Sequence, residues 1–131
     1  MTRNPIELAR KLGIRVLYED LGCVKGFYNT SLQYKFIHIN RSLKGQKMIL
    51  TAAHELGHAL IHAESNTPFM IAHTYFSINR YEAEANKFAA HLLISDNEIQ
   101  ELCNMSYTIG QIAVYYGLPE KLIELKMQDI V

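Results

Sequence analysis

Residues 48–62 read MILTAAHELGHALIH and predict the helix around which the other elements are arranged. Apolar residues cover most of the helix circumference, and the pattern extends back to about Leu43. Such a helix belongs in the centre of a fold, because it has apolar surface to bury on several sides. His54, Glu55 and His58 interrupt this surface. Each polar group that is buried without a partner costs about 1–3 kcal/mol, so these side chains should share a partner.

The three polar residues form the pattern His-Glu-x-x-His. Histidines four residues apart lie on one face of a helix, so His54 and His58 can reach a single tetrahedral zinc ion. Glu55 then lies beside the open side of the ion, where its carboxylate can act on a water molecule. The motif therefore predicts a zinc-dependent hydrolytic site. The alternative is a pair of buried histidines that only form hydrogen bonds.

The site needs a third protein ligand, because a catalytic zinc ion usually has three such ligands and a water molecule. The metzincin extension of the motif is excluded, since Ile61 and Glu64 stand where that class requires Gly and His. The third ligand should therefore come from another segment.

Two acidic residues on the helix predicted at 80–93 are candidates for this ligand. Glu82 and Glu84 point about 200° apart on a helix, so only one of them can face the metal. We favour Glu82, because Asn86 lies one turn later on the same face and could hold the distal nitrogen of a zinc-bound histidine. The small side chain of Ala85 would let this helix approach the central one closely. Glu84 is the alternative ligand.

The segment HELGHALIH and the later segment EAEANKFAAHLL together resemble the ImmA/IrrE family of small zinc metallopeptidases. The resemblance extends over most of the chain, from the strand ending in IHIN to the final segment IAVYYGLPEKLIELK. It implies that His54, His58 and Glu82 are the metal ligands and that Glu55 is the catalytic acid/base. It also implies a protein of a prophage or other mobile element that cleaves a helix-turn-helix repressor and so acts as an anti-repressor.

The remaining pattern predicts an α+β fold. Three consecutive strands suggest a small antiparallel sheet packed against a helical bundle, a minimal zincin-like fold in one domain over residues 1–131. Residues 64–79 read as a long connection, because they contain Pro68 and mix aromatic with polar residues. The expected strands lie at about 14–18, 22–28 and 34–40, and the expected helices at about 4–13, 43–62, 80–93, 97–103, 108–116 and 119–127.

Peptide hydrolysis at this site would require a hydrogen-bond donor to the oxyanion besides the metal. His38, Tyr28, His73 and Tyr75 are candidates, because they lie on the strands or in the connection nearest the motif. A structural role is the alternative for each of them. An extended substrate peptide could pair with an exposed strand such as residues 34–40.

Two further features near the motif have simpler explanations. His62 continues the row of histidines but lies two turns from His54, so we expect it to pack at the end of the helix instead of binding the same ion. Arg41, Lys44 and Lys47 form a basic cluster at the start of the central helix. Such clusters are usually solvated, although an acidic segment of a partner could dock there.

Residues 108–126 suggest a different class of function, a helix-turn-helix DNA-binding module, because Ala113, Gly117 and Ile123 have the spacing of that motif. The would-be recognition helix, residues 119–126, carries two acids against two lysines and few side chains suited to reading bases. A packing or docking role is therefore favoured. A third possibility is a metal-binding regulator that sequesters its partner without cutting it, which would have the same ligands.

The composition of the 131-residue chain narrows the choice of partners. Basic and acidic residues are equal at 13 each, so the excess positive charge that supports nucleic-acid or anionic-lipid binding is missing. No segment approaches the roughly 18 apolar residues of a membrane span, and the start lacks a signal-peptide pattern. Cys23 and Cys103 lie outside any metal-binding spacing. We expect a cytoplasmic protein that acts on another protein.

Overall fold

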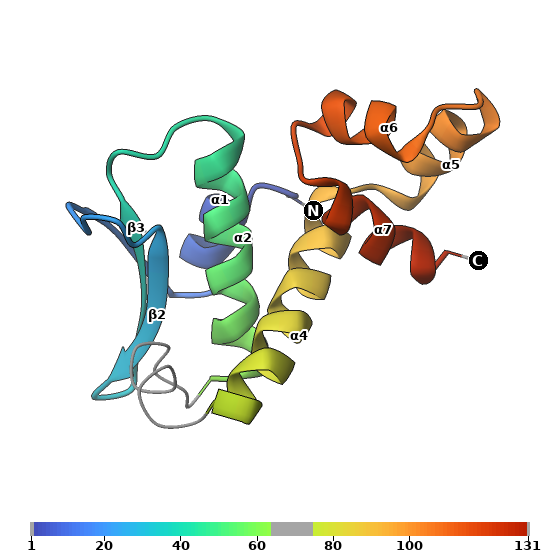
Figure 1. Cartoon of the computed structure of the whole chain (residues 1–131). Coiled ribbons are helices and arrows are strands. Elements are labelled where there is room, and N and C mark those ends of the chain that lie inside the picture. Colours follow the sequence, from blue (N-terminus) through green and yellow to red (C-terminus); the bar gives the residue numbers. More distant parts are fainter. Residues whose placement is uncertain (1, 64–74, 131) are drawn as a thin grey trace.

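The computed structural model describes residues 2–63 and 75–130, with side chains from residue 80 onward in the second range. One helix precedes three strands, and the other described helices follow them, which confirms the α+β class (Figure 1). In chain order the elements are α1 (Pro5–Lys11), β1 (Arg15–Glu19), β2 (Gly26–Ser31), β3 (Tyr34–Asn40), α2 (Gln46–Ile61), α4 (Tyr75–Leu93), α5 (Asp96–Asn104), α6 (Ile109–Tyr116) and α7 (Glu120–Gln128).

The three-stranded sheet is mixed, so the prediction of an antiparallel sheet was wrong. The strand order is β1-β3-β2, with β2 antiparallel and β1 parallel to β3. Alternation along a strand shows which residues face the core, but it does not show which strands are neighbours. Successive strands reverse direction here, so placing the third strand beside the first makes that pair parallel. Ile37 and Ile39 of this central strand are 1% and 0% exposed, so they belong to the buried core.

β2 begins later in the chain than the strand predicted at 22–28, and with β3, which has the predicted bounds of 34–40, it forms a hairpin. Its turn consists of Leu32 and Gln33, which have positive φ values of 51° and 71°. Tight hairpin turns of this geometry usually carry Asn or Gly at these positions. The chain has neither there, so the turn gave no signal in the sequence.

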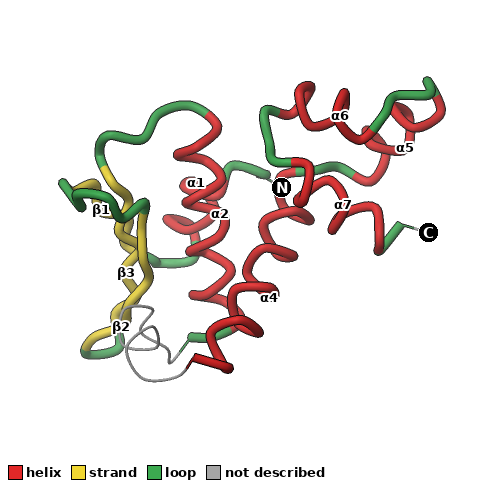
Figure 2. Tube along the Cα trace, viewed as in Figure 1, coloured by secondary structure: helices red, strands yellow, loops and turns green. Residues whose placement is uncertain are grey.

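α2 is the central helix, as predicted. The sheet lies on one side of it and α4 on another, with α1 also packed against it (Figures 1 and 2). Ala53, Leu56 and Ala59 are fully buried, which explains why this helix is apolar around most of its circumference. The sheet and the two long helices thus hold the polar residues of α2 inside the fold.

Gly57 lets α4 approach α2 closely. A Cβ atom at Gly57 would lie 3.1 Å from the Cα atom of Ala85 and 3.2 Å from the Cβ atom of Phe88. The predicted role of Ala85 as a small residue at this contact is confirmed, because its Cα atom is the nearest atom to that position. The close contact brings the polar face of α4 against the two histidines of α2.

Polar side chains cap the first turns of α5 and α6. Ser95 and Thr108 are the N-cap residues of α5 and α6, and Thr108 forms a capping box with Gln111. α6 ends at Gly117, whose φ of 68° is the left-handed conformation that glycine adopts readily. The side chain of Gln46, in the first turn of α2, donates a hydrogen bond to the carbonyl oxygen of Tyr116 at 2.8 Å. This bond ties the turn between α6 and α7 to the central helix.

α4 starts at Tyr75, five residues before the helix predicted at 80–93. Residues 75–79 contain neither Pro nor Gly, so nothing in that stretch stops the helix from extending toward the N-terminus. The rest of the predicted connection, residues 64–74, lies outside the described residues. Among the described helices, none has both the length and the apolarity that a membrane crossing requires.

Candidate metal centre

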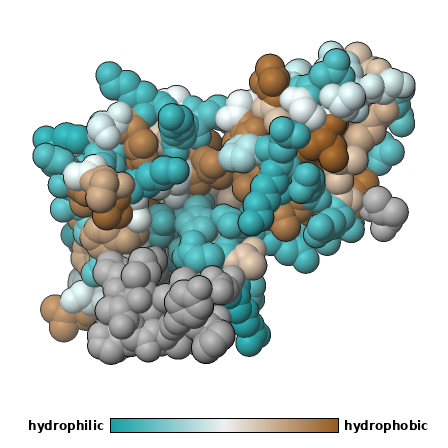
Figure 3. Space-filling model, in the orientation of Figure 1, coloured by the Kyte–Doolittle hydropathy of each residue, from teal (hydrophilic) through white to brown (hydrophobic). Residues whose placement is uncertain are grey.

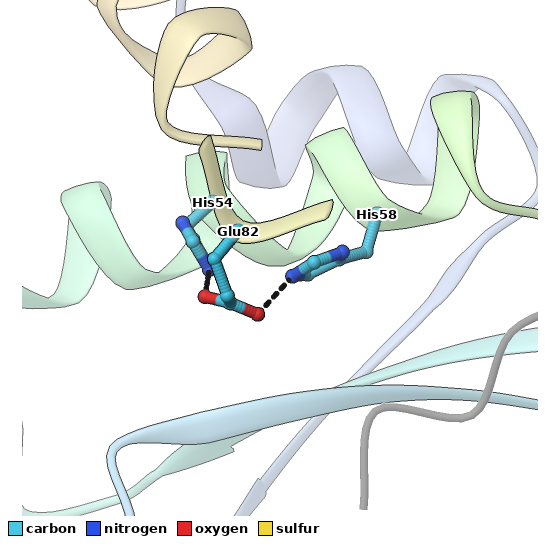
Figure 4. A group of neighbouring side chains, drawn as sticks. All are labelled: His54, His58 and Glu82. Carbon is cyan, nitrogen blue, oxygen red and sulfur yellow. Dashed lines mark hydrogen bonds and ion pairs between the residues drawn. The ribbon is translucent and has the colours of Figure 1, made fainter. Parts of the chain in front are cut away.

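His54 and His58 on α2 point to one carboxylate on α4, that of Glu82 (Figure 4). The Nε2 atom of His54 lies 2.6 Å from Oε2 of Glu82, and the Nε2 atom of His58 lies 2.9 Å from Oε1. One donor atom from each of the three side chains lies within 4.8 Å of the others, an arrangement that could hold a metal ion. The structure brings Glu82, and not Glu84, to the two histidines.

Each histidine of this group is also held at its other ring nitrogen. Nδ1 of His54 lies 2.7 Å from Oδ1 of Asn86, the contact predicted from the faces of α4. Nδ1 of His58 lies 3.1 Å from Nδ1 of His62, whose Nε2 lies 3.4 Å from Oε1 of Glu84. These outer contacts fix the ring orientations and leave both Nε2 atoms directed at the same point.

His62 therefore has a larger role than the packing at the helix end that we predicted. It directly follows the last residue of α2 and is only 8% exposed. The signal in the sequence was its spacing of four residues from His58, which places the two rings on the same helix face. The contact with Glu84 depends on how α4 packs, so it had no local signal.

Glu55 lies beside these residues on α2 and is 5% exposed. Within the described residues its Oε1 atom has no hydrogen-bond partner. Burial away from water raises the pKa of its carboxyl group to about 7, although His54 and His58 oppose the shift. A buried carboxyl oxygen without a partner is unusual in a purely structural residue, and it is expected in a group that acts on a bound molecule.

Burial, hydrogen bonds and neighbouring charges together shift the pKa values of Glu82 and His54. Burial alone would raise the pKa of Glu82, but hydrogen bonds to His54 and His58 outweigh it and hold the pKa far below its usual range. Burial alone would lower the pKa of His54. The hydrogen bond to Glu82 and the charges of the nearby carboxylates outweigh burial, so the pKa is raised. A cation bound between the two histidines and Glu82 would replace the protons that form these hydrogen bonds.

The two predicted oxyanion donors that the structure describes, His38 and Tyr28, contact other groups. Nδ1 of His38 contacts Glu19, its Nε2 lies 2.5 Å from Asn29, and its ring stacks on Phe27. The hydroxyl group of Tyr28 donates to the carbonyl oxygen of Ala63, just beyond α2. His73 and the side chain of Tyr75 lie outside the described part of the chain.

The prediction that a substrate could pair with residues 34–40 was wrong. β3 is the central strand of the sheet, and its backbone is paired with β1 on one side and with β2 on the other. A further strand has no free edge to bind there. The mistake came from assigning the strand without knowing its neighbours.

α6 and α7 form the predicted helix pair, but α7 is poorly placed to read DNA. Leu122 and Ile123 are buried, and Lys126 is 3% exposed in an ion pair with Asp96. The exposed side chains of α7 include Glu120, Lys121 and Glu124. Acids therefore outnumber lysines among these three, which does not suit contact with a phosphate backbone.

Comparison with known proteins agrees with this geometry. Residues 9–128 match the peptidase M78 family, described as the IrrE N-terminal-like domain. An uncharacterized immunity region protein 2 of Bacillus phage phi105 is 41% identical over 126 residues, which are 95% of this chain and 80% of the phage protein. The metallopeptidase ImmA of Bacillus subtilis (strain 168) is 29% identical over 133 residues, which are 98% of this chain and 78% of that protein. No solved structure matches the chain. With its His-His-Glu group and a match over nearly its whole length, the chain belongs to the peptidase M78 family of ImmA-like metallopeptidases.

Proposed function

We propose that this protein is a zinc-dependent endopeptidase in which His54, His58 and Glu82 bind the metal and Glu55 is the acid/base. The observation that carries the proposal is the His-His-Glu group with the buried carboxyl group of Glu55 beside it, whose Oε1 atom has no hydrogen-bond partner among the described residues. Two imidazoles and one carboxylate are a common ligand set of catalytic zinc, and they leave a position open for water. The donor set therefore suits zinc better than magnesium or calcium, which prefer oxygen ligands.

Zinc in such a site supplies Lewis acidity, polarising a carbonyl group and lowering the pKa of a water molecule toward about 7. The protein supplies the proton transfers. The pKa of Glu55, raised to about 7 by burial, suits a carboxylate that accepts a proton from water and returns it to the leaving amine. Asn86 and His62 hold the two histidine rings in place while this occurs.

We further propose that the substrate is a helix-turn-helix transcriptional repressor encoded on the same prophage or mobile element, and that cleavage occurs in the cytoplasm. Support comes from the family resemblance and from the similarity to a phage immunity region protein. A protein substrate also follows from the family of metallopeptidases to which the chain belongs.

Coexpression with the repressor encoded beside its gene tests this function. The unchanged protein should give a cleaved repressor and expression from the repressed promoter, whereas Glu55→Gln should give neither. Glu101→Gln, which makes the same change at an exposed position on α5, should behave like the unchanged protein. Equal derepression by the unchanged protein and by Glu55→Gln, with an intact repressor, would instead establish a regulator that sequesters its partner without cutting it.

The contact between His62 and His58 predicts a measurable effect on metal affinity. If Nε2 of His58 binds a metal, Nδ1 of His58 would carry the proton and donate a hydrogen bond to Nδ1 of His62. His62→Ala should weaken zinc binding by about 10-fold to 100-fold, the usual loss when an outer hydrogen-bond partner of a ligand is removed. His62→Asn should restore most of the affinity, because its amide oxygen can accept the same hydrogen bond. Competition with a chelating dye measures both, and equal affinities for Ala and Asn variants would contradict the role.

A further inference from the structure

A groove of about 950 Å³ runs from the candidate metal centre along the first half of α2. One end is lined by His54, Glu55 and Asn86. The side walls are α2 on one side and the α6–α7 pair on the other, and the surface is hollowed between these parts (Figure 3). Its volume is at the upper end of the range for ligand pockets, roughly 300–1,000 Å³. The groove can therefore admit a segment of peptide chain that reaches Glu55.

The wall of the groove is largely apolar away from the metal centre. Leu118 and Leu122 are nearly buried there, 5% exposed each, while Val114 is 83% exposed. Leu43 and Leu50 add apolar surface from the α2 side. Apolar side chains that converge on one groove favour binding of an apolar group from a ligand.

The two walls of the groove are connected at the end far from the candidate metal centre, which fixes the distance between them. The hydrogen bond from Gln46 to Tyr116 joins α2 to the end of α6. A Cβ atom at Gly117 would lie 3.0 Å from Cγ of Gln46, so glycine allows this close contact. The α6–α7 pair, which the DNA-binding interpretation left without a role, is thus fixed as one wall of the groove.

The charged side chains that line the groove indicate which charge a ligand should have. Lys25, Lys47 and Lys121 line the groove and are exposed, against one exposed acid, Glu120. Within the described residues, none of these lysines forms an ion pair. The basic cluster predicted at the start of α2 contributes to the groove through Lys47. The local field therefore favours an acidic partner segment.

We propose that this groove binds the part of the protein substrate next to the scissile bond, and that it selects a segment with a bulky apolar side chain flanked by acidic residues. The inference rests on the proposed peptidase function, because the groove ends at Glu55, the proposed acid/base. The apolar side chain lies against Val114 and Leu50, and the acidic residues lie near Lys47 and Lys121. Specificity of this kind would spare proteins that lack an accessible segment with both features.

Binding of labelled peptides tests the groove separately from hydrolysis. The protein carries Glu55→Gln throughout, so that a bound peptide is not cut, and fluorescence anisotropy reports affinity. Three ten-residue peptides are compared: one with Leu among glutamates, one with Leu among lysines, and one with Ser among glutamates. The first should bind about 10-fold more tightly than the third, the value of burying one apolar side chain. Its affinity should fall as salt is added.

Substitutions in the groove should change these affinities in a specific way. Val114→Asp should weaken the Leu–glutamate peptide about 10-fold, and Lys47→Glu should weaken it about threefold to fivefold. Two exposed positions that do not line the groove serve as matched controls: Met105→Asp and Lys11→Glu should leave the affinity unchanged. Lys47→Glu should also bind the Leu–lysine peptide more tightly than before, which a mere loss of folding would not do.

The outcomes separate the two proposals. Equal affinity for the three peptides, or no effect of Val114→Asp and Lys47→Glu, would overturn the groove inference and leave the peptidase proposal standing. Selective binding that the groove variants abolish would support the inference even if the repressor is not cleaved in coexpression, in which case the peptidase proposal alone would fail.

Discussion

Glu82→Ala is expected to leave the purified protein with almost no bound zinc, whereas the unchanged chain should hold about one ion. The carboxylate of Glu82 is the only one within hydrogen-bond distance of Nε2 of both His54 and His58 among the described residues. Removing a direct ligand should weaken zinc affinity by more than about 100-fold, the largest loss that an outer partner alone usually causes. Elemental analysis after dialysis against a weak chelator measures the content.

Glu84→Ala is the matched control, because it makes the same change two residues away on the same helix. Glu84 contacts His62 at 3.4 Å and pairs with Arg80, but it does not reach the two candidate ligands of α2. Its loss should leave about one zinc ion per chain. Far-UV circular dichroism should show the same helix content in both variants, since alanine is a strong helix former. Full zinc content in Glu82→Ala, or its loss in Glu84→Ala alone, would refute the ligand assignment.

Glu55→Gln should lower kcat/KM by about 10²-fold to 10⁴-fold, the usual contribution of a general acid/base. The amide of Gln keeps the shape of the side chain but cannot take a proton from water. Zinc content should stay at about one ion per chain, because Glu55 is not among the three side chains that converge on one point. Cleavage of the repressor by purified protein measures the rate, and undiminished cleavage would exclude Glu55 as the acid/base.

The same substitution should stabilise the metal-free protein at high pH. Burial raises the pKa of Glu55 in the folded state to about 7, above the ordinary value of 4.5. The stability that the protonated acid provides is fully present below about pH 4.5 and is lost as pH rises through about 7. Gln cannot ionise, so Glu55→Gln should exceed the unchanged protein in free energy of unfolding by about 3 kcal/mol near pH 8, with little difference near pH 5.

Urea unfolding in the presence of a chelator measures this difference. The chain contains no tryptophan, so the helix signal in circular dichroism is the appropriate probe. A stability gain that is the same at both pH values would show that packing, and not ionisation, distinguishes the two side chains. A gain near pH 8 alongside lost activity would identify Glu55 as a residue kept at a cost in stability.

Much of the candidate site could be predicted because helix geometry is local. The spacing of His54 and His58 places them on one face of α2, and the faces of α4 separate Glu82 from Glu84 without knowledge of the rest of the fold. Asn86 followed from the same argument, and its contact with His54 is confirmed. The caps at Ser95 and Thr108 are local features of the same kind, since they depend on residues within one turn.

The errors share a different cause. The parallel pairing of β1 with β3 and the central position of β3 depend on segments far apart in the chain. Alternation reports the face of a strand and carries no information about its neighbour. The contact of His62 with Glu84 and the groove between α2 and the α6–α7 pair likewise arise only when separate helices pack.

The sequence by itself thus determined the α+β class, the central helix and the residues able to hold a metal, because each follows from periodicity within one helix or strand. Only the tertiary structure decided the strand order, the support of His58 by His62, and the groove that leads to Glu55. These features depend on the distance between segments that are remote along the chain, and that distance is set by how their buried faces, such as Gly57 against Ala85, fit together.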